Sequence, residues 1–268
     1  MQSSIEDFFT MSGGSRSRAT TRDIPKYYYL YKNMNIYNAV WTDTKPDTIL
    51  FHKEIKWKNN GIVTICSNFI CNGKETNNNI NHKYIPILKS NLQKCIRRNE
   101  TENALKTSKT LIKLNIIQFI RRLSIIMLED CILHESFMVL SWFIAAYPHF
   151  ESDNNDIQFL LGIVKYLGDL IYRDYYDKIE SFNIQTIIKS DKLSSEHKSI
   201  LYSLQFRASY GGLKGDICMI NSLTEIWQKR METNKLLSHI SNKITPYSEK
   251  ISYIKKIILD TKELFTAQ

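Results

Sequence analysis

The feature that most constrains this fold is a change in the spacing of apolar residues near residue 84. Beyond that point apolar residues recur three and four positions apart, first in a stripe that follows Pro86 and contains Ile87, Leu88, Leu92, Cys95 and Ile96. This period is typical of amphipathic helices. The same period continues in Thr101 to Leu114, Ile116 to Leu128, Glu135 to Tyr147, Asp156 to Tyr176, Ser194 to Tyr210, Asp216 to Met231 and Ser248 to Phe265. We therefore predict that residues 84–268 form one helical domain, with the apolar segment Phe137 to Tyr147 buried at its centre.

Residues 25–83 lack this helical spacing and are rich in aromatic and β-branched residues. The strand-like runs are Tyr27 to Tyr31, Tyr37 to Trp41, Thr48 to Trp57 and Ile62 to Ile70. Asn60-Gly61, between the last two runs, predicts a β-hairpin. The polar loop of residues 72–83 marks an internal boundary. The expected fold is mainly α: a multi-helix body with a small N-terminal β-rich aromatic section.

The aromatic residues of this section have two interpretations. In the first they fill the core of a small sheet, as large aromatic side chains commonly do. In the second, exposed Tyr and Trp side chains stack on nucleic-acid bases beside Lys32, Lys53, Lys56 and Lys58.

The net charge indicates which kind of binding partner to expect, and the cysteines indicate the cellular compartment. The net charge of +9 favours polyanionic partners, of which DNA is the one we expect. The five cysteines contain no C-x-x-C pair, which argues against a disulfide framework and a structural zinc site and favours a reducing, intracellular compartment. There is no apolar run of about eighteen residues, so we expect no membrane span.

The first nine residues contain an octet with defined spacing. Gln2, Ile5, Phe8 and Phe9 occupy its first, fourth, seventh and eighth positions. In one 3₁₀ turn, residues three apart lie on one face, so Ile5 and Phe8 form an apolar plug with Phe9 beside it. This octet resembles the PIP box, the peptide by which replicative DNA ligase and uracil-DNA glycosylase hold the PCNA sliding clamp. The alternative is a terminus whose phenylalanines pack on the protein's own core.

The resemblance implies a PCNA-type clamp as partner and a nuclear or viral replication compartment. Residues 10–24 are rich in Gly, Ser and Thr and carry Arg16, Arg18 and Arg22, so we expect a flexible basic linker between the PIP-box peptide, residues 1–9, and the rest of the chain. Such a linker lets the peptide search for the clamp while the body acts elsewhere.

Six basic residues of the helical body are candidate nucleic-acid contacts: Arg97, Arg98, Arg121, Arg122, Arg207 and Lys214. A structural ion pair with Glu129 or Asp130 is the alternative for the pair Arg121-Arg122, because it lies in an apolar helix. The segment from Ser209 to Asp216 contains three of the nine glycines of the chain. Its Gly211 or Gly212 can end one helix and Asp216 can N-cap the next, or its backbone amides can hold a phosphate with Lys214.

Catalytic motifs are absent from the sequence, so we assign no catalytic, metal or cofactor site. Glu129, Asp130, His134 and Glu135 have metal-ligand chemistry, but a polar helix junction explains them equally well. A stretch of the body, Leu92 to Arg98, Ala104-Leu105, Phe119 to Leu123 and Glu129-Asp130, is similar to the helical region of replication-associated recombination ATPases, whose ATPase domain is absent here. The expected function is therefore a clamp-binding accessory protein of DNA replication or repair. The alternatives are a clamp-recruited, nuclease-like enzyme and a helical interaction scaffold.

Overall fold

The structure is a computed structural model that describes residues 24–34, 36–57, 60–70, 82–147, 149–174, 190–236 and 240–243. Within these ranges a four-stranded sheet precedes a set of helices, so the mainly α fold with a small aromatic β section is confirmed. The predicted PIP-box peptide, the basic linker up to residue 23 and the predicted helix Ser248 to Phe265 lie outside the described residues.

The four strands are β1 (Tyr27–Asn33), β2 (Ile36–Thr42), β3 (Phe51–Trp57) and β4 (Gly61–Ser67). Their order in the sheet is β2-β1-β4-β3, with β1 parallel to β4 and the outer pairs antiparallel. The predicted hairpin is present, but Gly61 pairs with Trp57 and is the first residue of β4 rather than part of the turn. Its φ of 115° still requires glycine.

The helices are α1 (Ile85–Arg97), preceded by the 3₁₀ turn η2 (His82–Tyr84), α2 (Thr101–Asp130), α3 (Ser136–Ala146), α4 (Asn154–Asp169), α5 (Ser195–Ser209) and α6 (Lys214–Glu232). The two predicted segments on either side of residue 115 are halves of α2, separated by a kink where Asn115 has non-helical backbone angles (φ −167°, ψ 97°).

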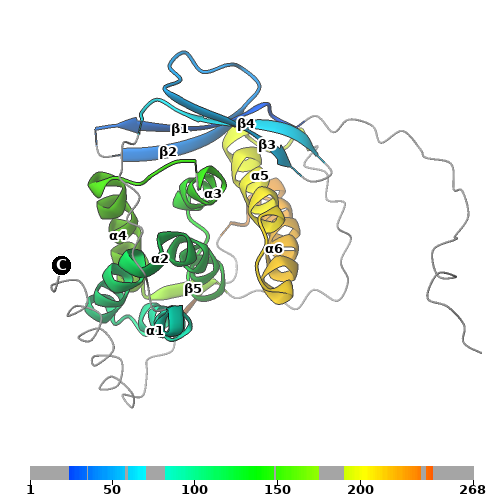
Figure 1. Cartoon of the computed structure of the whole chain (residues 1–268). Coiled ribbons are helices and arrows are strands. Elements are labelled where there is room, and N and C mark those ends of the chain that lie inside the picture. Colours follow the sequence, from blue (N-terminus) through cyan, green and yellow to red (C-terminus); the bar gives the residue numbers. More distant parts are fainter. Residues whose placement is uncertain are drawn as a thin grey trace, which may run out of the picture.

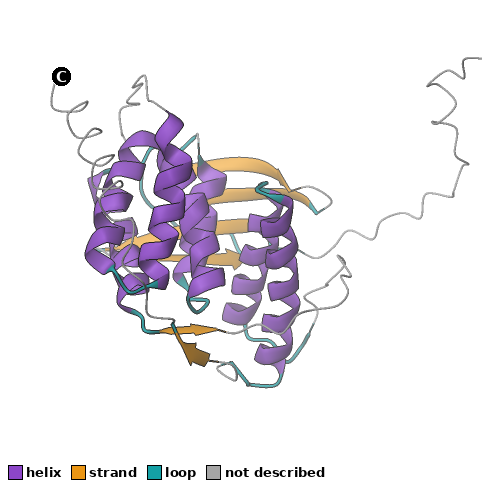
Figure 2. Cartoon of the chain, turned by 90° about the horizontal axis from the view of Figure 1, so that it is seen from below, coloured by secondary structure: helices purple, strands orange, loops and turns teal. Residues whose placement is uncertain are grey.

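The helices cover one face of the four-stranded sheet, as Figures 1 and 2 show. Helix α3 lies directly beneath the sheet, and α1 and α2 lie farther from it (Figure 1). Every residue of α3 except Met138 is buried, and Trp142 Nε1 donates to the carbonyl oxygen of Tyr28 in β1 at 3.1 Å. The predicted central position of this apolar segment is confirmed, although the helix ends at Ala146 and Tyr147 is exposed.

The inner face of the sheet is lined by large aromatic side chains. The Tyr28 and Trp41 rings stack with centroids 4.2 Å apart, and Trp41 and Trp57 each meet the Phe206 ring of α5 edge-on at 5.1 Å. For these residues the core interpretation is correct, because all four are buried. The alternating residues of β1, such as Tyr29, are only half-buried and face the other side, where the β2–β3 connection rises over the sheet (Figure 1).

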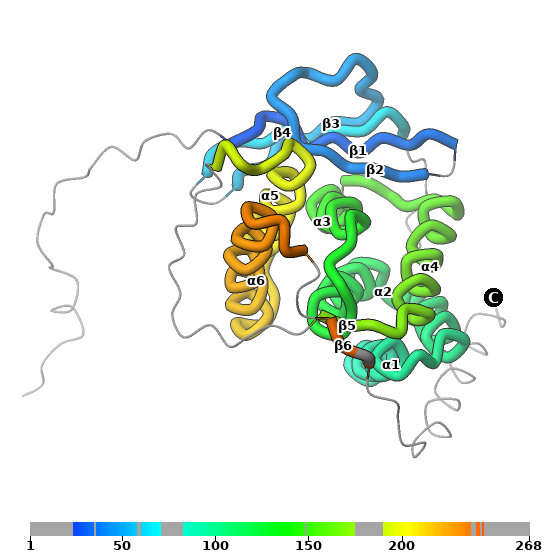
Figure 3. Tube along the Cα trace, turned by 180° about the vertical axis from the view of Figure 1, so that it is seen from behind, coloured from blue at the N-terminus to red at the C-terminus, as the bar shows by residue number. Residues whose placement is uncertain are grey.

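The predicted helix from Asp156 to Tyr176 is too long. Helix α4 ends at Asp169 and the chain continues into β5 (Tyr172–Asp174), which pairs with β6 (Ile240–Asn242) at the end of the molecule opposite the four-stranded sheet (Figure 3). Asp174 also forms an ion pair with Arg230 of α6, and its N–H donates to the Cys131 carbonyl at 2.9 Å. These partners are distant in sequence and override the local helical pattern.

Candidate anion-binding site

Four of the six predicted basic residues lie in two environments, and Arg98 and Lys214 lie apart from both at helix ends. Arg97 is the last residue of α1, and Arg98 follows it as the C-cap. Arg121 and Arg122 lie in the second half of α2, Arg207 in the last turn of α5, and Lys214 is the first residue of α6. Arg97 belongs to a network with carboxylates, whereas Arg121, Arg122 and Arg207 gather at a second place.

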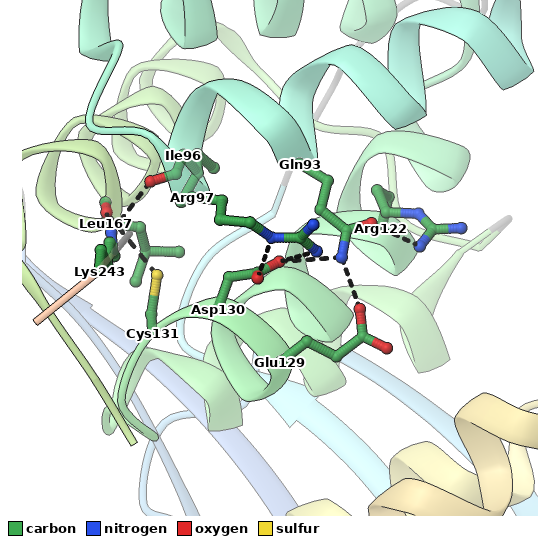
Figure 4. A network of polar contacts seen from close by, with 9 residues as sticks. All are labelled: Gln93, Ile96, Arg97, Arg122, Glu129, Asp130, Cys131, Leu167 and Lys243. Carbon is green, nitrogen blue, oxygen red and sulfur yellow. Dashed lines mark hydrogen bonds and ion pairs between the residues drawn. The ribbon is translucent and has the colours of Figure 1, made fainter. Parts of the chain in front are cut away.

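The first environment is an ion pair between α1 and the end of α2 (Figure 4). Arg97 Nε donates to Asp130 Oδ1 at 2.5 Å and its Nη2 to Oδ2 at 3.2 Å. Gln93 Nε2 donates to the same Oδ2 at 2.9 Å and to Glu129 Oε2 at 2.6 Å. The Asp130 side chain is only 2% exposed, so the Arg97 guanidinium neutralises a buried carboxylate.

Three of the residues considered as metal ligands, Glu129, Asp130 and His134, are in contact with other side chains. Asp130 and Glu129 are engaged by Arg97 and Gln93, while His134 Nδ1 lies 2.9 Å from the Ser136 hydroxyl and its ring packs on Tyr166. Burial raises the pKa of Glu129 and lowers that of His134. In the part of the chain that the structure describes, no group of three or more His, Cys, Asp or Glu residues is placed to hold a metal ion.

The second environment lies between α1, α2 and α5. Arg207 is only 2% exposed; its Nε donates to Ser124 Oγ at 3.1 Å and its Nη1 to the Gly211 carbonyl at 2.9 Å. The Ser124 hydroxyl in turn donates to the Arg121 carbonyl at 2.9 Å. The buried guanidinium of α5 is therefore fixed against the turn of α2 that carries Arg121.

Helix α1 adds a fourth cation to this place. Lys89 Nζ donates to Gln118 Oε1 at 2.9 Å, and one turn further along both helices Arg122 Nη1 donates to Gln93 Oε1 at 3.3 Å. We call Lys89, Arg121, Arg122 and Arg207 the basic cluster. Lys89 is not one of the six predicted basic residues, although it lies four residues before Gln93 and eight before Arg97 on one polar flank of α1.

The members of the basic cluster affect one another electrostatically. Burial, followed by the charges of Arg121 and Arg122, lowers the pKa of Arg207 to about 10. Burial and the charge of Arg122 likewise lower the pKa of Lys89, and Asp216 of α6 partly opposes both shifts. The four positive charges of the basic cluster therefore lie close together at positions that are buried or half-buried.

No carboxylate of the described residues forms an ion pair with the cluster. Between described residues the ion pairs are Arg97–Asp130, Lys165–Asp169 and Arg230–Asp174, and none of them involves a member of the basic cluster. The Nε atoms of Arg121 and Arg122 are buried and have no hydrogen-bond partner in the described part of the chain. The structural ion pair considered for these two arginines is thus not formed; Arg122 is held by an amide oxygen instead.

In the segment from Ser209 to Asp216 the predicted helix end at the glycines is present, but the predicted N-cap at Asp216 is not. Gly211 and Gly212 have φ values of 79° and 142°, which end α5 in backbone conformations suited to glycine. Asp216 is not the N-cap of α6, because α6 begins at Lys214 and its N-cap is Leu213, without a side-chain cap bond. Asp216 lies instead in the first turn, where its carboxylate complements the helix dipole.

A separate buried cation, Lys243, links the last described residues to the body (Figure 4). Its Nζ donates to the carbonyl oxygens of Ile96 at 3.1 Å and Leu167 at 2.6 Å, near the C-terminal ends of α1 and α4. These carbonyls carry partial negative charge and stabilise the ammonium by direct hydrogen bonds, and the charges of Asp130 and Asp169 also favour it. Burial raises the pKa of the neighbouring Cys131 thiol to about 11, which leaves it protonated and unreactive at neutral pH.

Comparisons with protein-family models, with curated proteins and with solved structures give no match to this chain. As to membranes, the helices among the described residues are too short or too polar to cross a bilayer.

Proposed function

We propose that this protein is an accessory factor of DNA replication or repair that binds a PCNA-type sliding clamp through its N-terminus. The observation that carries the proposal is the octet with Gln2, Ile5, Phe8 and Phe9 at the spacing of a PIP box. In such short peptides a few aromatic anchors supply most of the binding energy, and the remaining positions tolerate substitution.

The helical body is proposed to bind nucleic acid or a further replication protein. The net charge of +9 supports a polyanionic partner, and the basic cluster supports it because its charges have no carboxylate in ion-pair contact among the described residues. Of the remaining basic candidates, Arg98 and Lys214 are at helix ends, where their side chains reach solvent, while Arg97 is engaged by Asp130.

The test of the clamp proposal is a direct binding measurement. A fluorescent peptide of residues 1–22 is titrated with the sliding clamp of the same cell or virus and followed by anisotropy. We expect saturable binding that is lost in Phe8→Ala/Phe9→Ala, because each buried aromatic anchor contributes about 2 kcal/mol, or about thirtyfold in Kd. Gln2→Ala is expected to cost less, since water can replace part of its hydrogen bonding.

The matched control is Ser3→Ala, at a position that the spacing does not use. It should bind like the unmodified peptide. The full-length Phe8→Ala/Phe9→Ala protein should keep its melting temperature. If the peptide fails to bind the clamp and the full-length double variant melts several degrees lower, Phe8 and Phe9 belong to the protein's own core, and the scaffold alternative is supported instead.

A further inference from the structure

We infer that the basic cluster is a binding site for a phosphate monoester group, such as that of a nucleotide or of a phosphorylated nucleic-acid end. The inference does not depend on clamp binding, because it is drawn from Lys89, Arg121, Arg122 and Arg207 and not from the N-terminal octet.

The first reason is a buried charge whose hydrogen-bond acceptors are all neutral among the described residues. A guanidinium that is taken out of water is costly unless an opposite charge or hydrogen-bond acceptors replace its hydration. Arg207, at 2% exposure, has two neutral oxygen acceptors, and Arg121 and Arg122 lie near enough to lower its pKa further. An anion that binds between these groups would remove the repulsion among them.

The second reason is the number and kind of free donors. Among the described residues, the buried Nε atoms of Arg121 and Arg122 have no acceptor. Of the three guanidinium nitrogens of Arg207, Nε and Nη1 donate to acceptors in this part of the chain. The cluster thus offers nitrogen donors from three guanidinium groups on two helices. Planar guanidinium donors match the oxygens of a phosphate, which accepts several charge-assisted hydrogen bonds at once.

The third reason is the balance of charge. Among the described residues, the carboxylates that act on the cluster are Glu129, which affects Arg122, and Asp216, which affects Lys89 and Arg207. Four cations and two carboxylates leave an excess of two positive charges. A phosphate monoester carries about −1.5 to −2 at pH 7, whereas a backbone diester carries a single negative charge, so the monoester neutralises the excess.

Burial also selects a small or terminal group. Arg207 is almost fully buried, and Lys89, Arg121 and Arg122 are half-buried between helices. The phosphates along a duplex cannot leave its surface to enter such a place, whereas a chain end or a free nucleotide can. The first turn of α6, next to Gly212 and carrying Asp216, lies beside the cluster and adds the positive end of a helix dipole.

The test begins with inorganic phosphate and the full-length protein. Its melting temperature is measured against phosphate concentration, with chloride added to hold ionic strength constant. At a phosphate concentration of about ten times Kd we expect a rise of about 4 °C. The rise should be larger at pH 7.5 than at pH 5.5, because the second pKa of phosphate is about 6.

Two variants, Arg121→Gln and Arg122→Gln, distinguish a ligand site from a structural role. Each removes one of the repelling charges, so we expect an unchanged or higher melting temperature in phosphate-free buffer together with loss of the phosphate response. Lys109→Gln, on an exposed position of the same helix, is the matched control and should respond like the wild type. A wild type that does not respond to phosphate, or variants that keep the full response, would overturn the inference.

A second measurement separates the two sources of the phosphate group. Fluorescent oligonucleotides with a 5′-phosphate and a 5′-hydroxyl are compared by anisotropy, with a mononucleotide as competitor. Tighter binding of the phosphorylated strand that Arg122→Gln abolishes assigns the site to a nucleic-acid end. Equal binding of the strands, with a thermal response to the mononucleotide, assigns it to a free nucleotide. Equal binding without that response contradicts the inference. Clamp binding by the N-terminal peptide can succeed or fail independently of all three outcomes.

Discussion

The neighbouring residues Arg97 and Arg98 should respond very differently to the same substitution. Arg97→Ala removes the ion-pair partner of a carboxylate that is 2% exposed, whereas Arg98→Ala removes a half-buried side chain that forms no ion pair with any described residue. The two substitutions delete the same side chain one position apart, so each is the other's control.

The expected loss of stability in Arg97→Ala follows from the hydrogen bonds that Asp130 retains. Without Arg97 it loses hydrogen bonds of 2.5 and 3.2 Å and retains one from Gln93 at 2.9 Å. Removing one partner of a buried pair costs about 3–5 kcal/mol. The Arg97 side chain is 42% exposed, so water can enter the space it leaves, and we take the lower end, about 3 kcal/mol. Arg98→Ala should change stability by less than about 0.5 kcal/mol.

Replacing the carboxylate instead of the guanidinium gives a second test of the Arg97–Asp130 ion pair. Asp130→Asn leaves a guanidinium that can turn toward solvent, so its cost should be smaller, about 1.5 kcal/mol. Urea denaturation followed by circular dichroism gives these differences. The double variant Arg97→Ala/Asp130→Asn should be less destabilised than the two single effects added together, because both single changes break one interaction.

The reasoning is refuted if Arg97→Ala costs no more than Arg98→Ala, or if Asp130→Asn is the more damaging member of the pair. The result also bears on function. A loss of nucleic-acid binding in an Arg97 variant reports unfolding as well as lost contact, whereas Arg98 variants report the contact alone.

Two further predictions concern α4. In Gly168→Ala the new Cβ would lie 3.2 Å from the Thr101 Cα, so we expect a loss of about 2 kcal/mol in urea denaturation; Gly162→Ala in the same helix meets open space and should gain about 0.5–1 kcal/mol, and equal effects would contradict the packing. Burial raises the pKa of Asp156, whose carboxylate accepts from the Tyr37 hydroxyl at 2.6 Å. The protonated form is thus favoured by folding, and the stabilisation present below the ordinary pKa of 3.8 is lost as the pH rises through the folded value. Asp156→Asn should therefore become more stable relative to the wild type with rising pH in that window, and a constant difference would contradict this.

Much of the fold was predictable because local patterns and tertiary contacts agree. The strand-like runs became strands, and the apolar segment around Trp142 became the buried helix α3. The break between the two predicted helices at Asn115 is a kink within α2. The end of α4 was not predictable, because β5 is stabilised by β6, Arg230 and the Cys131 carbonyl, none of which is local to it.

The site was predictable in composition but not in arrangement. Sequence reasoning selected Arg121, Arg122 and Arg207 as basic residues, yet Arg207 meets Ser124 from 83 positions away. It omitted Lys89, which lies on a polar flank of α1 four residues before Gln93. The corresponding flank of α2, Gln118 and Arg122, has the same four-residue spacing. Two matching polar flanks beside apolar stripes were the available signal that these helices pack side by side.

The pairing of α1 with the second half of α2 separates the charges along their length. At its C-terminal end Arg97 and Gln93 donate to Asp130 and Glu129, so both carboxylates of this helix pair have their hydrogen-bond partners there. At its N-terminal end Lys89 and Arg122 donate to amide oxygens and Arg207 of α5 donates to the Ser124 hydroxyl, while Asp216 of α6 acts on Lys89 and Arg207 without forming an ion pair. A purely structural interface would gain by distributing the acids evenly, because each unpaired buried charge costs free energy. The uneven distribution therefore favours an anionic ligand, and not the fold, as the partner of the basic cluster.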